Sequence, residues 1–285
     1  ITDDFSQTYL LTEEIIKNNG VISPDCVEEM LIRWSNIPKY FNRFAGPTTR
    51  SAIAAIRAKK EGREYVVNEV IDYARQATNG SAMKISPAGF FNPGDVDKAI
   101  EDAVCVTRVT HDNQLAISGA CATAAAISRA FDEKASVYDI IQAGIYGARK
   151  GEEIGMRISR TVGGPSVTER IGMAVAIAML PESKEDRLRK IYNLVGTGLH
   201  VSEAVPAAFG IILICDGDNW ESVCEAVNVG YDTDTVAAIV GSIVGALKGT
   251  AGISEELFEI LNRENEIALE ETAEKVTALV YDKMK

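Results

Sequence analysis

The chain has 285 residues, which is enough for one large domain, or two small ones, with a substantial buried core. Its composition, 46% hydrophobic and 25% charged, is typical of a soluble globular protein. The net charge of -12 excludes nonspecific nucleic-acid binding, because neutralising phosphates requires clustered lysine and arginine. If such an acidic protein binds a phosphorylated ligand, metal ions or backbone N–H groups must assist it locally.

Apolar residues recur mostly at helical spacing, and the period-two alternation typical of strands is almost absent. In chain order, the pattern predicts helices over Asp4–Asn18, Pro24–Trp34, Thr49–Lys60, Glu64–Ala77, Asp95–Val106, Asn113–Phe131, Val137–Arg149, Ser166–Met179, Lys184–Leu194, Glu203–Ile214, Asn219–Val227, Thr233–Leu247, Glu255–Asn262 and Glu264–Lys283. No long linker rich in proline, serine or glycine interrupts the series. We therefore expect a single all-α domain over residues 1–285.

Two helix starts carry clear capping sequences. Ser23-Pro24-Asp25 places a cap residue before a proline at the first helical position, followed by an acid in the first turn. Asp95 follows the turn sequence Asn92-Pro93-Gly94 and precedes periodic apolar residues. Both boundaries support the helical prediction.

The cysteines and the apolar runs indicate a cytoplasmic protein. The five cysteines form no CxxC pair and lie in apolar helical patterns, so we expect reduced core thiols in a reducing cytoplasm. The longest apolar run, Val236–Leu247, is too short to span a membrane, and no signal peptide is present. Because the chain begins at Ile1 rather than methionine, we expect either that a preceding segment is missing or that the protein was cut there.

Glycines recur every four residues in one predicted helix, at Gly241, Gly245 and Gly249, with Ala237 in the same register. Each glycine costs a helix roughly 1 kcal/mol relative to alanine. Such a stripe therefore predicts a buried central helix that another backbone approaches closely.

Asp232 and Asp234 precede this glycine stripe. Residues two apart on a helix point to different faces, so the two converge only where an extended turn becomes a helix. They could simply cap the helix. A second pair, Asp3 and Asp4, also opens a predicted helix beside a threonine. Two such helix ends facing one another would suit two hard divalent cations rather than zinc, since the chain has only two histidines.

Four motifs occur in one order along the chain: Thr2-Asp3-Asp4, Thr78–Lys84 (TNGSAMK), Thr110-His111 and Gly230–Thr235 (GYDTDT). Together they resemble the ADP-ribosylglycohydrolase family, which includes the enzyme that removes ADP-ribose from dinitrogenase reductase. The resemblance covers nearly the whole chain. The combination is specific, although each motif alone is weak.

The resemblance implies an all-α, orthogonally packed domain with a centre of two divalent ions, Mg²⁺ or Mn²⁺. It implies that the metal ligands are Thr2, Asp3, Asp4, Asp232, Asp234 and Thr235, of which the four aspartates are also the candidate catalytic residues. In the family, the ions hold the distal ribose and a water beside its anomeric carbon. This chemistry is physically reasonable, because bound ions can activate a water molecule and carboxylates can stabilise an oxocarbenium-like transition state.

The resemblance also implies substrate-binding residues. The turn Asn79-Gly80-Ser81 corresponds to the family's loop beside the distal ribose and diphosphate, and His111 to a histidine that lines the ligand site. Gly198 and Leu199 correspond to a segment near the adenosine end. Without the resemblance, the turn is an ordinary one after a helix and His111 is part of a helix start. His200 is expected to be structural or exposed.

Four features depart from the family pattern. Phe5 stands where a second threonine is usual, and Tyr231 stands where a glycine usually precedes DTD, so both put bulk beside the metal site. Gln76 replaces an acid that some members use as general base. The family's upstream GDALG-like segment, with its glutamate, would lie before Ile1. We therefore expect one of the four aspartates to act as the base.

The leading hypothesis is a metal-dependent N-glycosidase that releases ADP-ribose from a modified side chain, with arginine favoured. One alternative is hydrolysis of a smaller ribosylated compound such as a nucleoside. Another is a noncatalytic ADP-ribose binder or structural protein. The expected partners are an ADP-ribosylated protein or a small ADP-ribosyl compound, with neither nucleic acid nor membrane, and the sequence leaves the oligomeric state open.

Overall fold

The computed structural model describes residues 1–65 and 77–283 of the chain. The α-helices of these residues are α1 (Asp3–Lys17), α2 (Pro24–Ser35), α3 (Pro38–Phe44), α4 (Pro47–Lys60), α5 (Ser86–Phe90), α6 (Val96–Arg108), α7 (Gln114–Ala130), α8 (Val137–Ile158), α9 (Val167–Ala178), α10 (Lys184–Lys190), α11 (Val201–Ile214), α12 (Asn219–Asn228), α13 (Thr233–Lys248), α14 (Glu255–Asn265) and α15 (Leu269–Lys283). A short 3-10 helix, η2 (Ala82–Lys84), and a π-helix, η3 (Ile191–Val195), complete the set. No strand occurs in the described residues, so the prediction of an all-α domain is confirmed.

The predicted helix starts are confirmed by their capping bonds. The Ser23 hydroxyl accepts a hydrogen bond from the Cys26 N–H at 3.4 Å, and the Asp95 carboxylate accepts one from the Lys98 N–H at 3.0 Å. Most of the helix predicted over Glu64–Ala77 lies outside the described residues, and its first two residues are irregular. Local capping chemistry therefore defines these two starts as the sequence indicates.

Several helices differ from the sequence-based prediction. The short helices α3 and α5 were not predicted, and α8 continues from Arg149 to Ile158. The boundary predicted between Asn262 and Glu264 lies later in the chain, because α14 continues to Asn265 and α15 begins at Leu269, after the left-handed Glu266. Helices this short depend on their packing, which sequence periodicity does not report.

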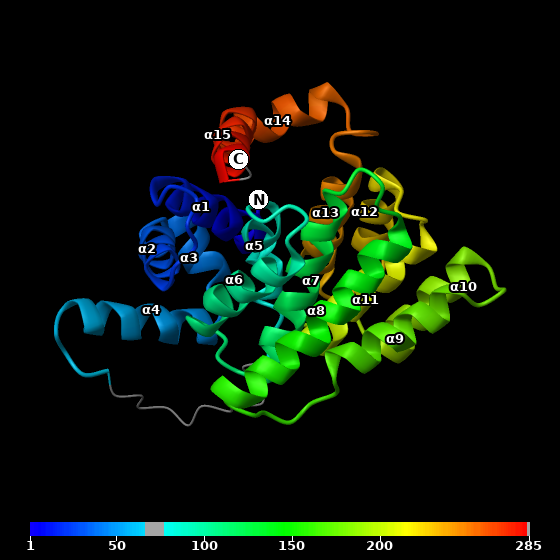
Figure 1. Cartoon of the computed structure of the whole chain (residues 1–285), viewed down its shortest axis with the longest axis horizontal. Helices are drawn as coiled ribbons and strands as arrows, with labels where there is room; N and C mark the ends of the chain where they lie inside the picture. The colour runs from blue at the N-terminus through cyan, green and yellow to red at the C-terminus, as the bar shows by residue number, and fades with distance from the viewer. Residues whose placement is uncertain (66–76, 284–285) are drawn as a thin grey trace.

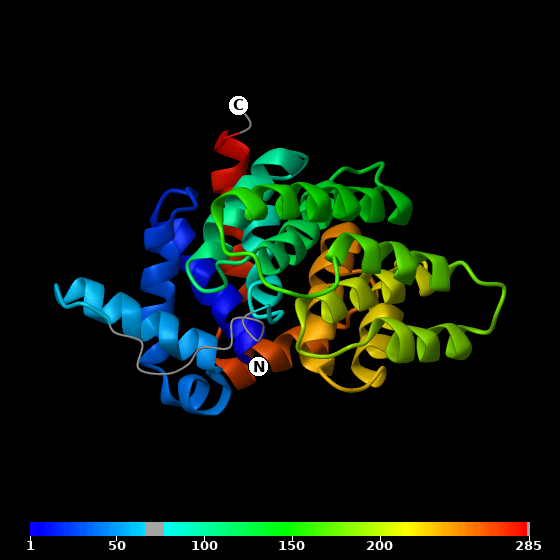
Figure 2. The same cartoon turned by 90° about the horizontal axis from the view of Figure 1, so that it is seen from below.

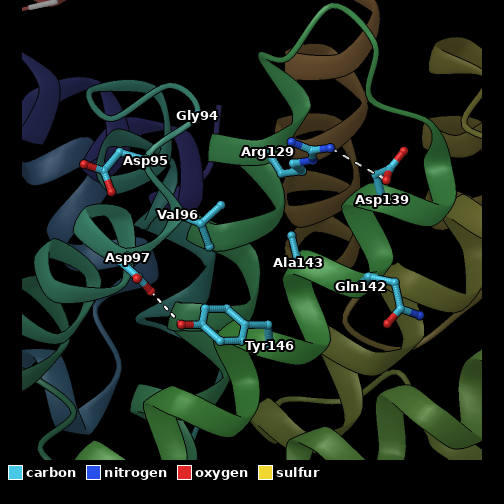
Figure 3. Close-up of a pocket in the computed structure, with 9 residues that line it drawn as sticks. All are labelled: Gly94, Asp95, Val96, Asp97, Arg129, Asp139, Gln142, Ala143 and Tyr146. Atoms are coloured by element: carbon cyan, nitrogen blue, oxygen red, sulfur yellow. Dashed lines mark hydrogen bonds and ion pairs between the residues drawn. The ribbon is translucent and has the colours of Figure 1, made fainter.

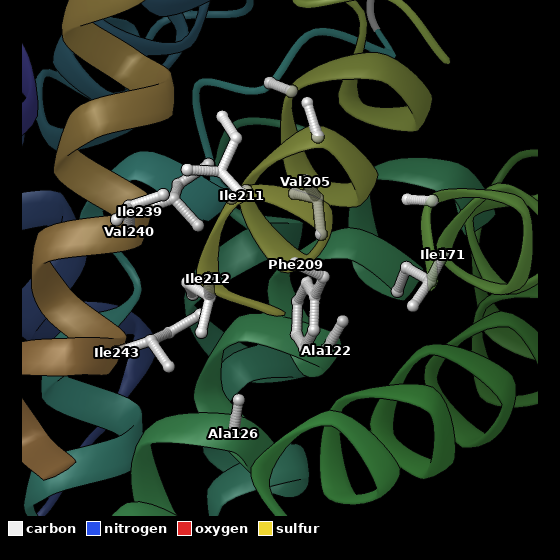
Figure 4. Close-up of a cluster of buried hydrophobic side chains, with 14 of the residues drawn as sticks. Ala122, Ala126, Ile171, Val205, Phe209, Ile211, Ile212, Ile239, Val240 and Ile243 are labelled. Atoms are coloured by element: carbon white, nitrogen blue, oxygen red, sulfur yellow. The ribbon is translucent and has the colours of Figure 1, made fainter. Parts of the chain in front are cut away.

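Helix α7 is the centre of the molecule, and every residue in it except Arg129 is buried. Figures 1 and 2 show α1–α4 on one side of it and α9–α12 on the other. One core cluster joins α7 to α9, α11 and α13, with Phe209 of α11 at its middle (Figure 4). A second cluster joins the other face of α7 to α1, α2 and α6. Two apolar cores thus meet on one helix.

Helices α7 and α8 approach each other closely. A Cβ atom added at Gly147 would lie 2.4 Å from the Cys121 carbonyl oxygen, and one at Gly151 would lie 2.7 Å from the Cys121 Cβ. Only glycine fits at these positions, so glycines of α8 allow the two helices to pack closely.

The glycine stripe of α13 does not have the predicted role. Gly241 would meet only the Val223 side chain, at 3.6 Å, and Gly245 would meet nothing within 4 Å. Gly249 ends the helix with a φ of 61°. The expected close backbone approach is therefore wrong, because α13 buries a different face, formed by Val236, Ile239, Val240, Ile243 and Val244.

All five cysteines are free. Within residues 1–65 and 77–283, no helix combines the length and the apolar character needed to cross a membrane.

Candidate functional site

The N-termini of α1 and α13 meet at one place in the fold. Asp3 and Asp4 are the first two residues of α1, and Asp234 is the second residue of α13. One carboxylate oxygen from each of these three aspartates lies within 4.8 Å of the others. The positive ends of two helix dipoles favour negative charge here. The fold thus brings together two motifs from opposite ends of the chain.

Asp4 is the most buried carboxylate of this group, with 2% of its surface exposed. Its Oδ2 accepts a hydrogen bond from the Thr2 hydroxyl at 2.7 Å. Its Oδ1 is buried and has no hydrogen-bond partner among the described residues. A buried oxygen without a partner is costly, and a divalent cation at this point would satisfy it. The donor set of carboxylates and threonine hydroxyls therefore fits a hard metal ion.

Burial and mutual repulsion shift the titration of these acids. Burial, with the neighbouring charge of Asp4 as the next cause, raises the pKa of Asp3 to about 7. Burial likewise raises the pKa of Asp4, although the Thr2 and Thr235 hydroxyls oppose the shift. For Asp232, burial raises the pKa to about 6 against a hydrogen bond from Asn79. Without a cation, the centre therefore holds protons close to neutral pH.

Asp232 is the N-cap residue of α13 and is held by Asn79. The Asn79 side-chain amide donates to the Asp232 Oδ2 at 2.5 Å and to the Gly198 carbonyl at 3.5 Å. The Asn79 backbone N–H donates to the Leu199 carbonyl at 2.9 Å. The Asp232 backbone N–H in turn donates to the Thr197 carbonyl at 3.1 Å. Three segments that are distant in sequence therefore meet around Asp232.

His111 lies directly behind the turn that carries Asn79. Its Nε2 is 2.9 Å from the Thr78 hydroxyl and its Nδ1 is 2.8 Å from the Thr110 hydroxyl. A Cβ atom at Gly80 would lie 3.0 Å from the His111 ring. Burial lowers the pKa of His111 to about 3, so the imidazole is neutral. The His111 ring thus packs against the turn, and both of its nitrogens form hydrogen bonds with threonine hydroxyls.

The remaining predicted binding residues differ in exposure. Ser81 is buried, and its hydroxyl is 3.5 Å from the Ala116 carbonyl, whereas the Leu199 side chain is 57% exposed. Gly198 is buried, and its N–H donates to the Glu203 carboxylate at 3.1 Å.

The comparisons with known proteins agree with this arrangement of motifs. A family model described as ADP-ribosylglycohydrolase matches residues 1–284. The chain belongs to the ADP-ribosylglycohydrolase family. This family is generally metal-dependent, and the described residues contain one acidic group that could hold a metal ion.

Two relatives and one solved structure show how far the likeness extends. The chain is 32% identical to "Uncharacterized protein YegU" of Escherichia coli K12 over 93% of this chain and 77% of the relative. It is 30% identical to an "Uncharacterized protein" of Archaeoglobus fulgidus over 98% of this chain and 80% of the relative. A structure described as "ADP-ribosylglycohydrolase-related protein complex" covers 98% of this chain and 81% of its own length, with a TM-score of 0.60 and 21% identity. The structural likeness shows the fold of this family.

Tyr231, which departs from the family's usual glycine, has an unusual backbone. Its φ is 69°, in the left-handed region that disfavours a bulky residue, and its side chain is 72% exposed. Its ring lies on Gly198, where an added Cβ would be 2.3 Å from the tyrosine Cε1. The other departure, Phe5, stacks on Tyr9 with ring centroids 6.0 Å apart. Tyr231 therefore adds an exposed ring beside Asp232.

Two buried residues next to the acidic centre were not singled out from the sequence. Lys84, at the end of η2, donates a hydrogen bond from its Nζ to the Gln7 Oε1 at 2.9 Å. Burial lowers the pKa of Lys84 to about 8, while Asp3 and Asp4 oppose that shift. A sequence signal existed, since Gln7 follows Asp4 by three residues on one helix face and Lys84 ends the TNGSAMK motif.

Two surface hollows of this glycohydrolase-family chain do not include the acidic centre. One of about 570 Å³ lies between the start of α6, the end of α7 and α8 (Figure 3). Four of its polar side chains form two pairs: the Tyr146 hydroxyl donates to the Asp97 carboxylate at 2.7 Å, and Arg129 faces Asp139 at 3.7 Å. A second, of about 390 Å³, lies beside α1 near Tyr9 and Tyr40. The carboxylates of the candidate centre line neither.

Proposed function

We propose that this protein is a metal-dependent hydrolase that cleaves the N-glycosidic bond between ADP-ribose and a protein side chain, with arginine favoured. The observation that carries the proposal is the meeting of Asp3, Asp4 and Asp234 within 4.8 Å of one another. The unpartnered Oδ1 of Asp4 supports a cation at this point. Membership of the ADP-ribosylglycohydrolase family supports the choice of reaction.

The residues proposed to hold the ions are Thr2, Asp3, Asp4, Asp232, Asp234 and Thr235. Two bound divalent ions, Mg²⁺ or Mn²⁺, would orient the ribose hydroxyls and lower the pKa of a water beside the anomeric carbon. The buried Oδ1 of Asp4 provides one oxygen ligand that has no other partner. Thr2 holds the other oxygen of the same carboxylate, at 2.7 Å.

The chain's own residues supply orientation and proton transfer. Asn79 holds the Asp232 carboxylate in one orientation through a 2.5 Å hydrogen bond. The Asp232 carboxylate, held in place by Asn79, is the candidate base that accepts the proton of the attacking water. The carboxylates also stabilise the positive charge that develops on the sugar during cleavage. These roles replace the base that Gln76 cannot provide.

The substrate side of the proposal places ADP-ribose along the segments that meet at Asp232. The distal ribose and diphosphate would lie at the Asn79–Ser81 turn, whose shape His111 supports from behind. The adenosine end would lie toward Gly198 and Leu199, whose carbonyls accept hydrogen bonds from the side-chain amide and the backbone N–H of Asn79, respectively. A glycine-containing turn allows backbone N–H groups to approach an anion, which helps a protein of this net charge.

Release of ADP-ribose from an ADP-ribosylarginine peptide, measured by chromatography with and without Mn²⁺, tests the proposal. We expect Mn²⁺-dependent release by the wild type and none by the double variant Asp232→Ala, Asp234→Ala. Activity that survives this double change would refute the assignment of the centre. Calorimetry with ADP-ribose separates the hydrolase from a noncatalytic binder, and absence of binding with and without Mn²⁺ would contradict both.

A further inference from the structure

Lys84 is a fully buried lysine beside the candidate metal centre. Its Nζ donates a hydrogen bond to the Gln7 Oε1 at 2.9 Å, and neither side chain is exposed. Gln7 follows Asp3 and Asp4 on α1 by about one helical turn, so the three residues share one face. The lysine is thus anchored to the same helix that presents two of the carboxylates.

The positive charge of Lys84 is balanced by the negative charges of Asp3 and Asp4 in the candidate metal centre. Among the described residues, Asp3 and Asp4 are the charged groups whose influence on Lys84 opposes its burial. An ammonium group removed from water costs several kcal/mol unless opposite charge lies near it. Carboxylates crowded together also repel one another without a positive charge nearby. In the metal-free protein, Lys84 and the carboxylates therefore stabilise one another.

We propose that Lys84 is the fixed countercharge of the acidic centre, which holds the carboxylates together without metal and weakens the binding of divalent ions. This inference rests on the metal centre of the proposed function. An arriving cation meets carboxylates that are already partly neutralised, and it is repelled by a buried ammonium in a region of low dielectric. Lys84 is in this sense a positioning residue, because it acts on the ions and the substrate only through the aspartates.

The test is a calorimetric titration of Mn²⁺ into metal-free protein at pH 7.5, without any substrate. Lys84→Met removes the charge and keeps a buried chain of similar size, and Lys84→Gln removes the charge and keeps a hydrogen-bonding group for Gln7. We expect both to bind Mn²⁺ about tenfold more tightly than the wild type, and Lys84→Arg, which keeps the charge, to stay within about twofold. A lysine that serves only to fill space would predict unchanged or weaker binding in the neutral variants, and that result would overturn the proposal.

Folding is followed in the same samples by circular dichroism. A neutral variant that folds only when Mn²⁺ is present supports the proposal, because the metal then supplies the missing positive charge. A neutral variant that stays unfolded with and without Mn²⁺ contradicts it. If the wild type itself binds no Mn²⁺, the metal centre of the proposed function fails. If the wild type binds Mn²⁺ and the neutral variants bind no more tightly, only the role of Lys84 fails.

Discussion

The side-chain amide of Asn79 donates a 2.5 Å hydrogen bond to the Oδ2 of Asp232, across 153 positions of sequence. The same amide also reaches the Gly198 carbonyl, so one asparagine joins three segments at the candidate site. Removing the Asn79 side chain would leave the Asp232 carboxylate free to rotate and would remove the hydrogen bonds that join the turn to Asp232 and Gly198.

Asn79→Ala should weaken ADP-ribose binding and lower any hydrolytic rate by about 10- to 100-fold, as is usual when a group that orients a metal-site carboxylate is lost. Calorimetry with ADP-ribose and Mn²⁺ measures the binding effect. Asn193→Ala is the matched control, because Asn193 is exposed and bonds only to the nearby Arg189 carbonyl, at 2.8 Å. Equal affinities for the two variants would show that Asn79 does not orient the site.

Asp3→Asn should raise the melting temperature of the metal-free protein. The pKa of Asp3 is raised in the fold from 3.8 to about 7, so the folded state binds this proton more tightly than the unfolded state. The carboxyl therefore costs no stability below about pH 4, and the cost grows as pH rises to about 7 and then stays constant. The gain from Asp3→Asn should follow the same course in thermal denaturation with a chelator present.

Asp97→Asn is the control, because folding shifts the pKa of Asp97 in the opposite direction from that of Asp3. The Asp97 carboxylate is exposed, and hydrogen bonds from Lys150 and Tyr146 lower its pKa. Its charged form is therefore favoured by folding, and its removal should not raise the melting temperature at any pH. A stabilisation of equal size in both variants would indicate relief of net charge rather than of burial at Asp3.

Tyr231→Gly should stabilise the protein by about 1 kcal/mol, because glycine adopts the left-handed conformation of this position without a steric penalty. Tyr231→Ala removes the same ring and keeps a Cβ at the same φ, so it should bring no such gain. Urea denaturation compares the two. If Tyr231→Gly is no more stable than Tyr231→Ala, the strain assigned to this turn is absent.

Gly151→Ala should destabilise the protein by about 1–3 kcal/mol, because its Cβ would lie 2.7 Å from the Cys121 Cβ in a packed core. Gly245→Ala should have the opposite effect and stabilise by about 0.5–1 kcal/mol, since its Cβ would meet nothing within 4 Å. Both glycines lie within helices, and they differ mainly in how closely other residues pack around them. Chemical denaturation that shows the same sign for both would contradict the packing described for α8 and α13.

The helical class and the chemistry of two helix starts follow from the local sequence. Capping at Ser23 and Asp95 depends on hydrogen bonds within one turn of helix. Such bonds join residues three or four apart, so a local reading finds them. The order of four short motifs was also enough to indicate the family, which the match over residues 1–284 confirms.

Which of these residues meet depends on how the helices pack together. The contact of Asp3 and Asp4 with Asp234, the bond from Asn79 to Asp232 and the burial of Lys84 join segments that are far apart in the chain. The glycines show the same limit: α13 and α8 both carry glycines at four-residue spacing, yet a Cβ at Gly147, Gly151 or Gly155 would clash with α7, whereas one at Gly241 or Gly245 would clash with no neighbour. Periodicity reports which face of a helix is apolar, whereas the neighbour of that face depends on how all the helices share one core.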